Sequence, residues 1–135
     1  MGFDGQTVNT LCLFSAAGSR EFDMSLFNSG DDMNAVPQKF EAETVSKVLH
    51  PSDDMVQGKE LRLIQEHFLV ACSIRDIVRQ HEGSGKSIND LHEFAAMQFN
   101  DVHPALSVAE LTGFHVDERD FEWNDAWHVT QKSLA

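Results

Sequence analysis

The sequence predicts a helix-rich α/β fold that is part of a domain, and three observations lead to this fold class. The 135 residues are 41% hydrophobic and 24% charged, which is the composition of about one globular domain. Amphipathic helix patterns fill most of the chain. The two candidate strands are too few for a parallel sheet that is covered on both faces. We therefore expect a segment of an α/β domain rather than a complete one.

The first half of the chain is predicted to contain one strand and one helix. Thr7–Phe14 is rich in β-branched and apolar residues, a pattern typical of a strand. Turn-forming residues at Ser25–Asp32 precede a helical pattern over Met33–Val48. Pro37 lies within that pattern and favours a kink, because proline removes a backbone donor. Leu49–Gly58 is predicted to be a loop.

The clearest predicted element is a helix over Lys59–His81, with an apolar stripe at 3.6-residue spacing. Oppositely charged residues sit one helical turn apart, Arg62 with Glu66 and Asp76 with Arg79. At 1.5 Å per residue this helix would be about 35 Å long. The stripe consists of Leu61, Ile64, Phe68, Ala71 or Cys72, Ile74 or Arg75, and Val78.

Three further elements are predicted in the last third of the chain. A short buried strand is expected at Phe94–Phe99, followed by a turn at Asn100–Pro104. Ala105–Glu118 has the pattern of an amphipathic helix. Asn124 is a candidate N-cap for a last helix over Asp125–Leu134.

Charge and apolar content exclude several classes of partner. The net charge of −12 argues against nucleic acid and anionic membranes, both of which attract basic residues. The longest apolar run, Phe68–Cys72, is far shorter than a transmembrane helix, which needs about 20 residues. The N-terminus has no signal-peptide pattern. Cys12 and Cys72 are expected to be free thiols of a cytoplasmic protein.

The segment Gly83–Ser87 reads GSGKS and ends like a phosphate-binding P-loop. That motif needs another glycine where Gln80 stands, and it must follow a strand. Here the segment follows the long predicted helix. A flexible connection is the better interpretation.

Seven histidines raise the hypothesis of a metal site. None of them forms the close HxxxH or HExxH pairs that metal sites use. We therefore expect no metal ligands here, only surface or helix-face histidines. Six of them lie at intervals of 11–14 residues: His67, His81, His92, His103, His115 and His128.

The turn Asn100–Pro104 leaves two interpretations open. It follows a predicted strand, where α/β folds place their ligand sites, and the carboxylate of Asp101 can orient the imidazole of His103. The alternative is a capped helix start with Pro104 in its first turn. The residue pattern alone favours neither.

Six stretches of the chain carry a family resemblance, and they run nearly from end to end. Together they resemble the α-glucan phosphorylases of the glycogen and maltodextrin type, in family order and at family spacing. The family enzyme is several times longer, so the chain resembles an internal segment of its N-terminal half. The stretches are DGQTVNTLCLFSA (Asp4–Ala16), FDMSLFNSGD (Phe22–Asp31), EAETVSKVLHPSDD (Glu41–Asp54), GKELRLIQEHFLVACSIRDIVRQH (Gly58–His81), MQFNDVHPALSVAEL (Met97–Leu111) and WNDAWHVTQKSLA (Trp123–Ala135).

The resemblance implies a fold and a reaction. The fold has two Rossmann-like domains of the GT-B glycosyltransferase type, and residues 1–135 would be part of the first. Orthophosphate would cleave the terminal α-1,4-linked glucose of a glucan, giving glucose 1-phosphate. The implied cofactor is pyridoxal phosphate, whose phosphate group assists proton transfer and whose lysine would lie outside this chain. The isolated segment would then lack activity.

The resemblance also assigns roles to four residues near the substrate. Asp101 and His103 match a turn that lines the family's glucose site, where His103 would donate to a sugar hydroxyl and Asp101 would hold the turn and contact the site. Asp53 and Asp54 match a mobile gate over that site.

Regulatory and assembly features follow from the same resemblance. Arg79 matches one of two arginines that bind activating phosphates, and Gln80 stands in place of the second. Residues 32–48 match a helix that packs across a homodimer interface. Departures from the family pattern include Cys12, Pro37 and Val102.

Two functional hypotheses of different classes remain at this point. The first is a segment of a pyridoxal-phosphate-dependent α-glucan phosphorylase. The alternative is a non-catalytic, truncated relative that acts as an interaction or dimerisation module. Retention of the glucose site at Asp101 and His103 would favour the first.

Overall fold

The computed structural model describes residues 5, 11–17, 42–49, 51–52 and 54–134. The chain divides into two compact units, residues 1–49 and residues 50–135. Outside the described residues lie the predicted turn at Ser25–Asp32, Pro37, Asp53 of the predicted gate, and most of the predicted interface helix.

In the first unit, residues 42–47 are helical, and they form the end of the helix predicted at Met33–Val48. Residues 11–17 have no regular secondary structure, so the strand predicted at Thr7–Phe14 is wrong for its last four residues. Leu11 and Leu13 are exposed, and a β-prone sequence stays irregular without a paired neighbour. The Ala16 N–H donates to Ser46 Oγ at 3.1 Å and joins the two described parts.

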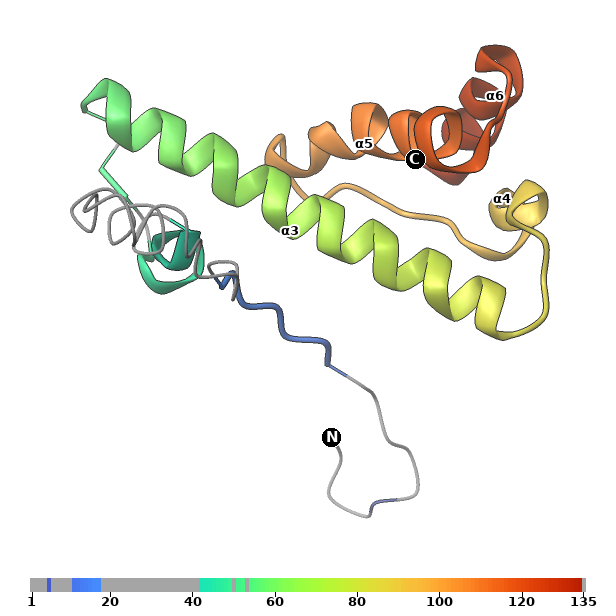
Figure 1. The fold of residues 1–135 in the computed structure, drawn as a ribbon, viewed down its shortest axis with the longest axis horizontal. Coiled ribbons are helices and arrows are strands. Elements are labelled where there is room, and N and C mark those ends of the chain that lie inside the picture. The colour runs from blue at the N-terminus through green and yellow to red at the C-terminus, as the bar shows by residue number, and fades with distance from the viewer. Residues whose placement is uncertain (1–4, 6–10, 18–41, 50, 53, 135) are drawn as a thin grey trace, which may run out of the picture. The chain divides into compact units, whose positions relative to one another are not determined.

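The second unit is built on α3, Val56–Gly83, the longest ribbon in Figure 1. It confirms the predicted helix and extends it at both ends. The predicted loop Leu49–Gly58 is therefore wrong for its last three residues, because no proline stands there to prevent the helix from beginning. The first described turn closes with a 3.1 Å bond from the Lys59 N–H to the Met55 carbonyl. Beyond the helix the chain reverses at Gly85, whose φ of +79° suits glycine.

One face of α3 carries the core. Its buried residues are Val70, Ile74, Val78 and His81, spaced three or four apart as on one helix face. The predicted stripe is right for Ile74 and Val78, whereas Ile64 is exposed. The reason is that the buried cluster lies against the second half of α3, where the following helices pack.

A short 3₁₀ turn, η1 (Ile88–Asp90), and a single-turn helix, α4 (Leu91–Phe94), follow α3. The strand predicted at Phe94–Phe99 is wrong, because Phe94 ends α4 and the rest forms only one parallel bridge, between Met97 and Leu134. A strand needs neighbours along its length, and the described residues supply one at a single position. The described part of the chain is accordingly helix-rich and contains no strand.

The predicted helix Ala105–Glu118 is confirmed as a continuous helical run in three parts. It starts with the 3₁₀ turn η2 (His103–Leu106), continues as α5 (Ser107–Gly113), and ends as the π-helix η3 (Phe114–Glu118). The change to π geometry comes directly after Gly113, a weak helix former. Pro104 lies in the first turn of η2, so the predicted helix start is confirmed, but its N-cap, Val102, makes no side-chain capping bond.

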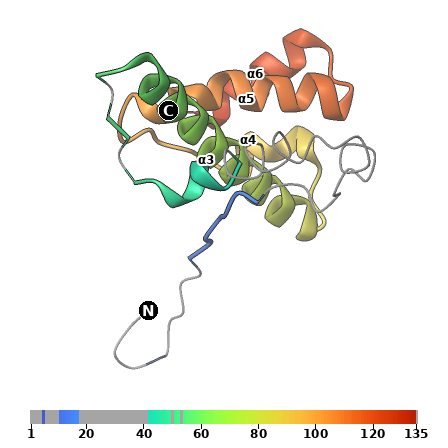
Figure 2. The same cartoon turned by 60° about the vertical axis from the view of Figure 1, so that its left-hand side comes forward.

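The last helix, α6 (Trp123–Ser133), starts two residues earlier than predicted. Its N-cap is Glu122, so the proposed cap at Asn124 is wrong. The Glu122 carbonyl accepts the N–H groups of Asp125 and Ala126, both at 3.0 Å. α6 packs against α4 and α5, as two views of the ribbon show (Figures 1 and 2).

The π-helix η3 is tied to α3 by charged side chains. Arg75 Nη1 donates to Glu118 Oε2 at 2.8 Å, and Arg119 Nη2 donates to Glu82 Oε2 at 2.9 Å. Both guanidinium groups lie over the Phe114 ring, with carbon-to-centroid distances of 5.6 and 5.0 Å. Two cation–π interactions therefore hold the Phe114 ring at the edge of the core.

His115 is fully buried within this core. Its Nδ1 lies 2.6 Å from the Leu111 carbonyl, which assigns the proton to Nδ1. Its ring packs edge-on against Phe121 at 5.0 Å. Burial lowers the pKa of His115 below its ordinary value of 6.5, and the charge of Arg119 adds to the lowering, while the Leu111 hydrogen bond opposes both.

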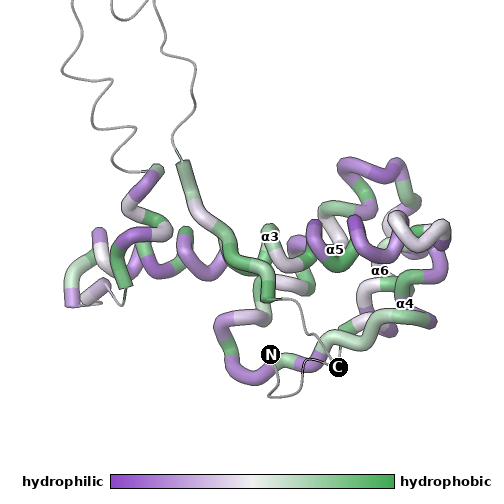
Figure 3. Tube along the Cα trace, turned by 90° about the horizontal axis from the view of Figure 1, so that it is seen from below, coloured by the Kyte–Doolittle hydropathy of each residue, from purple (hydrophilic) through white to green (hydrophobic). Residues whose placement is uncertain are grey.

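Polar and apolar positions alternate along the helices of this unit, as colouring by hydropathy shows (Figure 3). None of the helices in the described residues has the length and apolar content to cross a membrane.

We predict that Leu111→Ala lowers the free energy of unfolding by about 2–5 kcal/mol, because Leu111 is fully buried and its loss leaves a cavity. Urea denaturation followed by circular dichroism measures the change. Leu69→Ala removes the same atoms from an exposed position and serves as the control. Equal destabilisation by both variants would contradict this core.

We predict that His115 makes stability depend on pH in one direction. Because its pKa is lowered in the folded state, the unfolded state binds more protons as the pH falls below about 6.5, and stability falls with it. The stability that neutral His115 contributes is fully present above about pH 6.5. It is lost progressively as the pH falls from there to the lowered pKa. Denaturation midpoints between about pH 7.5 and pH 5 should fall more steeply for the wild-type chain than for His115→Leu. Parallel curves would refute the assignment.

Candidate functional site

The turn before η2 holds the imidazole of His103 beside a carboxylate. The Val102 N–H donates to Asp101 Oδ1 at 2.6 Å, which fixes the side chain of Asp101 on the turn. His103 Nδ1 lies 3.4 Å from Asp101 Oδ2. The structure thus brings together the two site residues that the sequence predicted, and the imidazole is 39% exposed.

Two residues of α3 approach the other side of the imidazole. Arg62 Nη2 lies 2.8 Å from His103 Nε2, and Glu66 Oε1 lies 3.4 Å from the same atom. Arg62 and Glu66 are one helical turn apart, with 3.4 Å between Nε and Oε1, which confirms the predicted pair. A guanidinium can only donate, so a neutral His103 imidazole with Nε2 as the acceptor carries its proton on Nδ1, on the side that faces Asp101.

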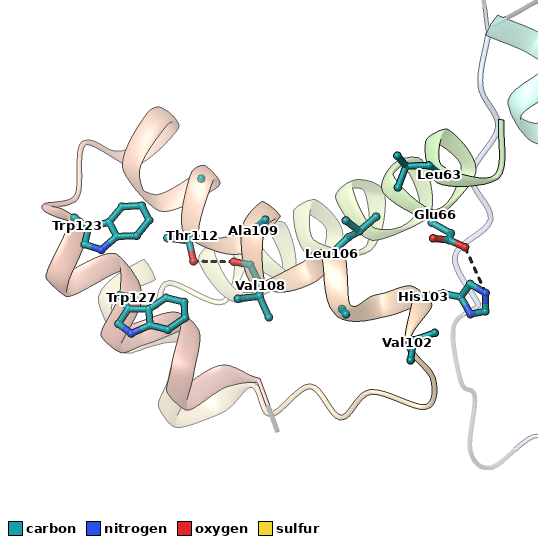
Figure 4. A pocket seen from close by; sticks show the side chains of 12 residues that line it. Leu63, Glu66, Val102, His103, Leu106, Val108, Ala109, Thr112, Trp123 and Trp127 are labelled. Atoms are coloured by element: carbon teal, nitrogen blue, oxygen red, sulfur yellow. Dashed lines mark hydrogen bonds and ion pairs between the residues drawn. The ribbon is translucent and has the colours of Figure 1, made fainter. Parts of the chain in front are cut away.

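A groove of about 600 Å³ opens beside His103. Its lining is mostly apolar. Figure 4 shows Glu66 and His103 at one end and the indoles of Trp123 and Trp127 at the other. The lining residues are Leu63, Glu66, Val102, His103, Ala105, Leu106, Val108, Ala109, Thr112, Gly113, Trp123 and Trp127.

The polar end of the groove suits a neutral, hydroxylated ligand. An imidazole N–H can donate, and the carboxylates of Asp101 and Glu66 can accept, so the cluster offers both partners that a hydroxyl group needs. Nothing in the described residues groups three or more His, Cys, Asp or Glu side chains in a way that would hold a metal ion.

Of the other predicted site residues, Asp54 and Arg79 make no hydrogen bond or ion pair with His103, and Asp53 is not among the described residues. Asp54 is exposed before α3, where its Oδ2 accepts from Ser52 Oγ at 2.9 Å. Arg79 is 17 residues beyond Arg62, about 25 Å along α3. There its Nη2 donates to Asp76 Oδ1 at 2.6 Å, which confirms the second predicted charge pair.

The P-loop-like segment is not in a P-loop context. It follows helix α3 and leads into the three-residue turn η1, whereas a P-loop joins a strand to a helix. Lys86 Nζ lies over the Phe94 ring, 3.6 Å from its centroid. The segment is therefore a connection between α3 and η1, as predicted, and not a P-loop.

The histidines differ in burial. His67 is exposed, and its Nε2 lies 3.0 Å from Glu110 Oε2. His81 on α3 and His115 on η3 are buried, so they are the helix-face histidines of the prediction rather than surface ones. His81 Nε2 lies 2.6 Å from the Ser87 carbonyl. Both buried rings thus satisfy at least one nitrogen on the backbone, which explains how a polar ring sits in the core.

Sequence reasoning missed Arg62 as a neighbour of His103, and it missed the two indoles of the groove. Arg62 was interpreted only as the helical partner of Glu66. Trp123 and Trp127 are four residues apart, so they lie on one face of α6, and this spacing was the available signal.

Comparison with known proteins shows a single family over the whole chain. The profile of the family described as "Carbohydrate phosphorylase" matches residues 1–135. The chain is 42% identical over 135 residues to a glycogen phosphorylase of Synechocystis, covering 100% of this chain and 16% of that protein. It is 40% identical over 134 residues to glycogen phosphorylase of Saccharomyces cerevisiae, covering 99% and 15%. Against the liver form of glycogen phosphorylase of Homo sapiens it is 40% identical over 142 residues, covering 99% and 17%. The chain thus spans about a sixth of the length of these relatives.

We predict that ¹⁵N spectra show His103 as the Nδ1–H tautomer, because Arg62 donates to Nε2. In Arg62→Leu the Nε2–H tautomer should gain population, since Glu66 Oε1 at 3.4 Å can then accept that proton. Arg79→Leu removes a more exposed arginine of the same helix and should leave the His103 signals in place. Unchanged signals in Arg62→Leu would contradict the arrangement.

Proposed function

Because the chain belongs to the carbohydrate phosphorylase family, we propose that it is a segment of the N-terminal, Rossmann-like domain of a GT-B α-glucan phosphorylase. The whole enzyme would use orthophosphate to cleave a terminal α-1,4-linked glucose and release glucose 1-phosphate. The observation that carries the proposal is similarity over 96–100% of the chain, at 39–42% identity, to proteins named glycogen phosphorylase. That similarity does not favour a separate interaction module.

Within that enzyme, we assign the cluster around His103 to the glucose site. The 3.4 Å separation of His103 Nδ1 from Asp101 Oδ2 is long for a hydrogen bond, so the Nδ1–H can turn its donation to a sugar hydroxyl. The same hydroxyl can donate to the Asp101 carboxylate, whose side chain is 61% exposed. Arg62 keeps Nε2 an acceptor and thereby keeps the proton on the side that faces Asp101.

Three further roles remain proposals that rest on the family resemblance. Asp53 and Asp54 would belong to a gate over the glucose site, and the exposed position of Asp54 leaves it accessible to substrate. Arg79 would contact an activating phosphate, and the 72% exposure of its side chain supports this. Residues 32–48 would contribute to a homodimer.

The described residues do not fit a pyridoxal phosphate site. That cofactor needs a lysine within an enclosed pocket. The described lysines, Lys47, Lys59, Lys86 and Lys132, are all exposed. We therefore place the cofactor and its lysine in the part of the enzyme outside this chain.

We predict that His103→Ala, in the full-length enzyme, lowers kcat/KM for phosphorolysis of a maltooligosaccharide by roughly 10- to 100-fold, the effect of losing one or two hydrogen bonds in a buried complex. Release of glucose 1-phosphate is the measurement. His67→Ala removes an exposed histidine of the same unit and should change kcat/KM less than about twofold.

A second control is the isolated 135-residue chain, from which we expect no glucose 1-phosphate above a blank. Sustained activity of the isolated chain would overturn the proposal that it is a segment. Absence of activity in the full-length wild-type protein would overturn the proposed reaction.

A further inference from the structure

We propose that His92 and His128 form a binding site for a divalent transition-metal ion of the Zn²⁺ type, with water in the remaining positions around the ion. The ion would join the single-turn helix α4 to α6. The inference goes beyond the proposed reaction and does not rest on it.

The two imidazoles lie together although they are far apart in the sequence. His92 is on α4 and His128 is on α6, and these two helices pack against each other (Figures 1 and 2). The ring centroids are 5.7 Å apart, and the ring planes are inclined at 74°. Two imidazoles that bind one Zn²⁺ ion at about 2.1 Å, in tetrahedral geometry, have their centroids about 5 Å apart. The observed separation is therefore close to the one that a shared ion requires.

One ring nitrogen of His92 lacks a partner. Its Nδ1 is buried and makes no hydrogen bond within the described residues. Such atoms are rare in native proteins, and a bound ion is one of the few reasons for them. Two other buried atoms share this property, His115 Nε2 and Ser133 Oγ, but both of these side chains are fully buried. Of the three side chains, His92 is the one that reaches the surface, and it does so beside a second imidazole.

Both rings can turn toward a common ion. His128 is exposed and His92 is half-buried, and within the described residues neither imidazole is held by a hydrogen bond or an ion pair. Rotation of the two side chains therefore breaks no polar contact. An ion bound by Nδ1 of His92 would give this nitrogen the partner that it lacks, while the proton of the neutral ring stays on Nε2.

The ligand atoms and the local charge define the class of ion. Imidazole nitrogens favour Zn²⁺, Cu²⁺ and Ni²⁺, whereas Mg²⁺ and Ca²⁺ prefer oxygen ligands. The net charge of −12 attracts cations, and the exposed Asp125 lies one helical turn before His128 on α6. In the part of the chain that the structure describes, no third His, Cys, Asp or Glu side chain completes a metal cluster. Water would therefore fill the other coordination positions.

This pair was outside the reach of the sequence argument about metal sites. That argument considered close pairs such as HxxxH, whereas His92 and His128 are brought together by the packing of α4 on α6. The unfolded chain does not hold the two rings together. An ion at this position would therefore bind the folded chain and stabilise the contact between the two helices.

Calorimetric titration of the full-length protein with ZnCl₂ tests the site, at about pH 7.5, where imidazoles are neutral. His92→Gln and His128→Gln should each weaken Zn²⁺ binding at least about tenfold, and the double variant should weaken it little further, because the two ligands act as a unit. His67→Gln removes an exposed histidine of α3 and should change the affinity less than about twofold. Additive losses in the double variant, or an equal loss in His67→Gln, would show independent surface histidines and overturn the proposal.

Electron paramagnetic resonance with an equimolar amount of Cu²⁺ gives a second readout. The spectrum of the unsubstituted protein should show coupling to two imidazole nitrogens, and that of His128→Gln should show one fewer. This comparison stands even if His92→Gln fails to fold, because the side chain of His128 is exposed. Zn²⁺ should also raise the urea midpoint of the unsubstituted protein and not that of His128→Gln. An unchanged copper spectrum, or an equal rise of the midpoint in both proteins, would overturn the proposal.

Discussion

Everything in the second unit depends on the burial of one face of α3. A helix of 28 residues is not held by its own hydrogen bonds alone, because most helical stability in proteins comes from packing an apolar face. Val70, Ile74 and Val78 provide that face, and α4 and α5 pack against it. The same helix then carries Arg62 to His103, 41 residues away in sequence. The packing of the core and the geometry of the candidate site therefore share one element.

The helices were predictable from sequence and the strands were not, for a physical reason. Helix hydrogen bonds are local, so the spacing of apolar residues in Lys59–His81 and Ala105–Glu118 contains nearly all the required information. Strand hydrogen bonds need a partner that lies far away in sequence. Phe94–Phe99 has the composition of a strand, but the described residues offer it only Leu134. Helix ends were off by two or three residues, as at Val56 and Trp123, because caps such as Glu122 act through the backbone rather than through a recognisable side chain.

The turn that carries Asp101 and His103 could be predicted from the sequence, whereas the residues that surround it could not. Asp101 and His103 are two residues apart, and their sequence pattern already suggested convergence on one ligand. The two interpretations of this segment turn out to be compatible, since Pro104 starts a helix and that start is what presents His103. Arg62 could not be assigned, because its contact with His103 depends on how α3 lies against η2, and no local pattern encodes a crossing between elements.

α3 also acts as a lever between the core and the site. Its buried anchor begins at Val70, eight residues or about 12 Å from Arg62, which sits on the more exposed half of the rod. A tilt of about 5° around that anchor would displace the guanidinium by about 1 Å, a misplacement that is costly in enzyme sites. Changes in side-chain volume at Val70 or Ile74 are thus felt at the imidazole of His103, which neither residue needs to touch. The buried residues that fix α3 are therefore as important to the geometry of the site as Arg62, the group that they position.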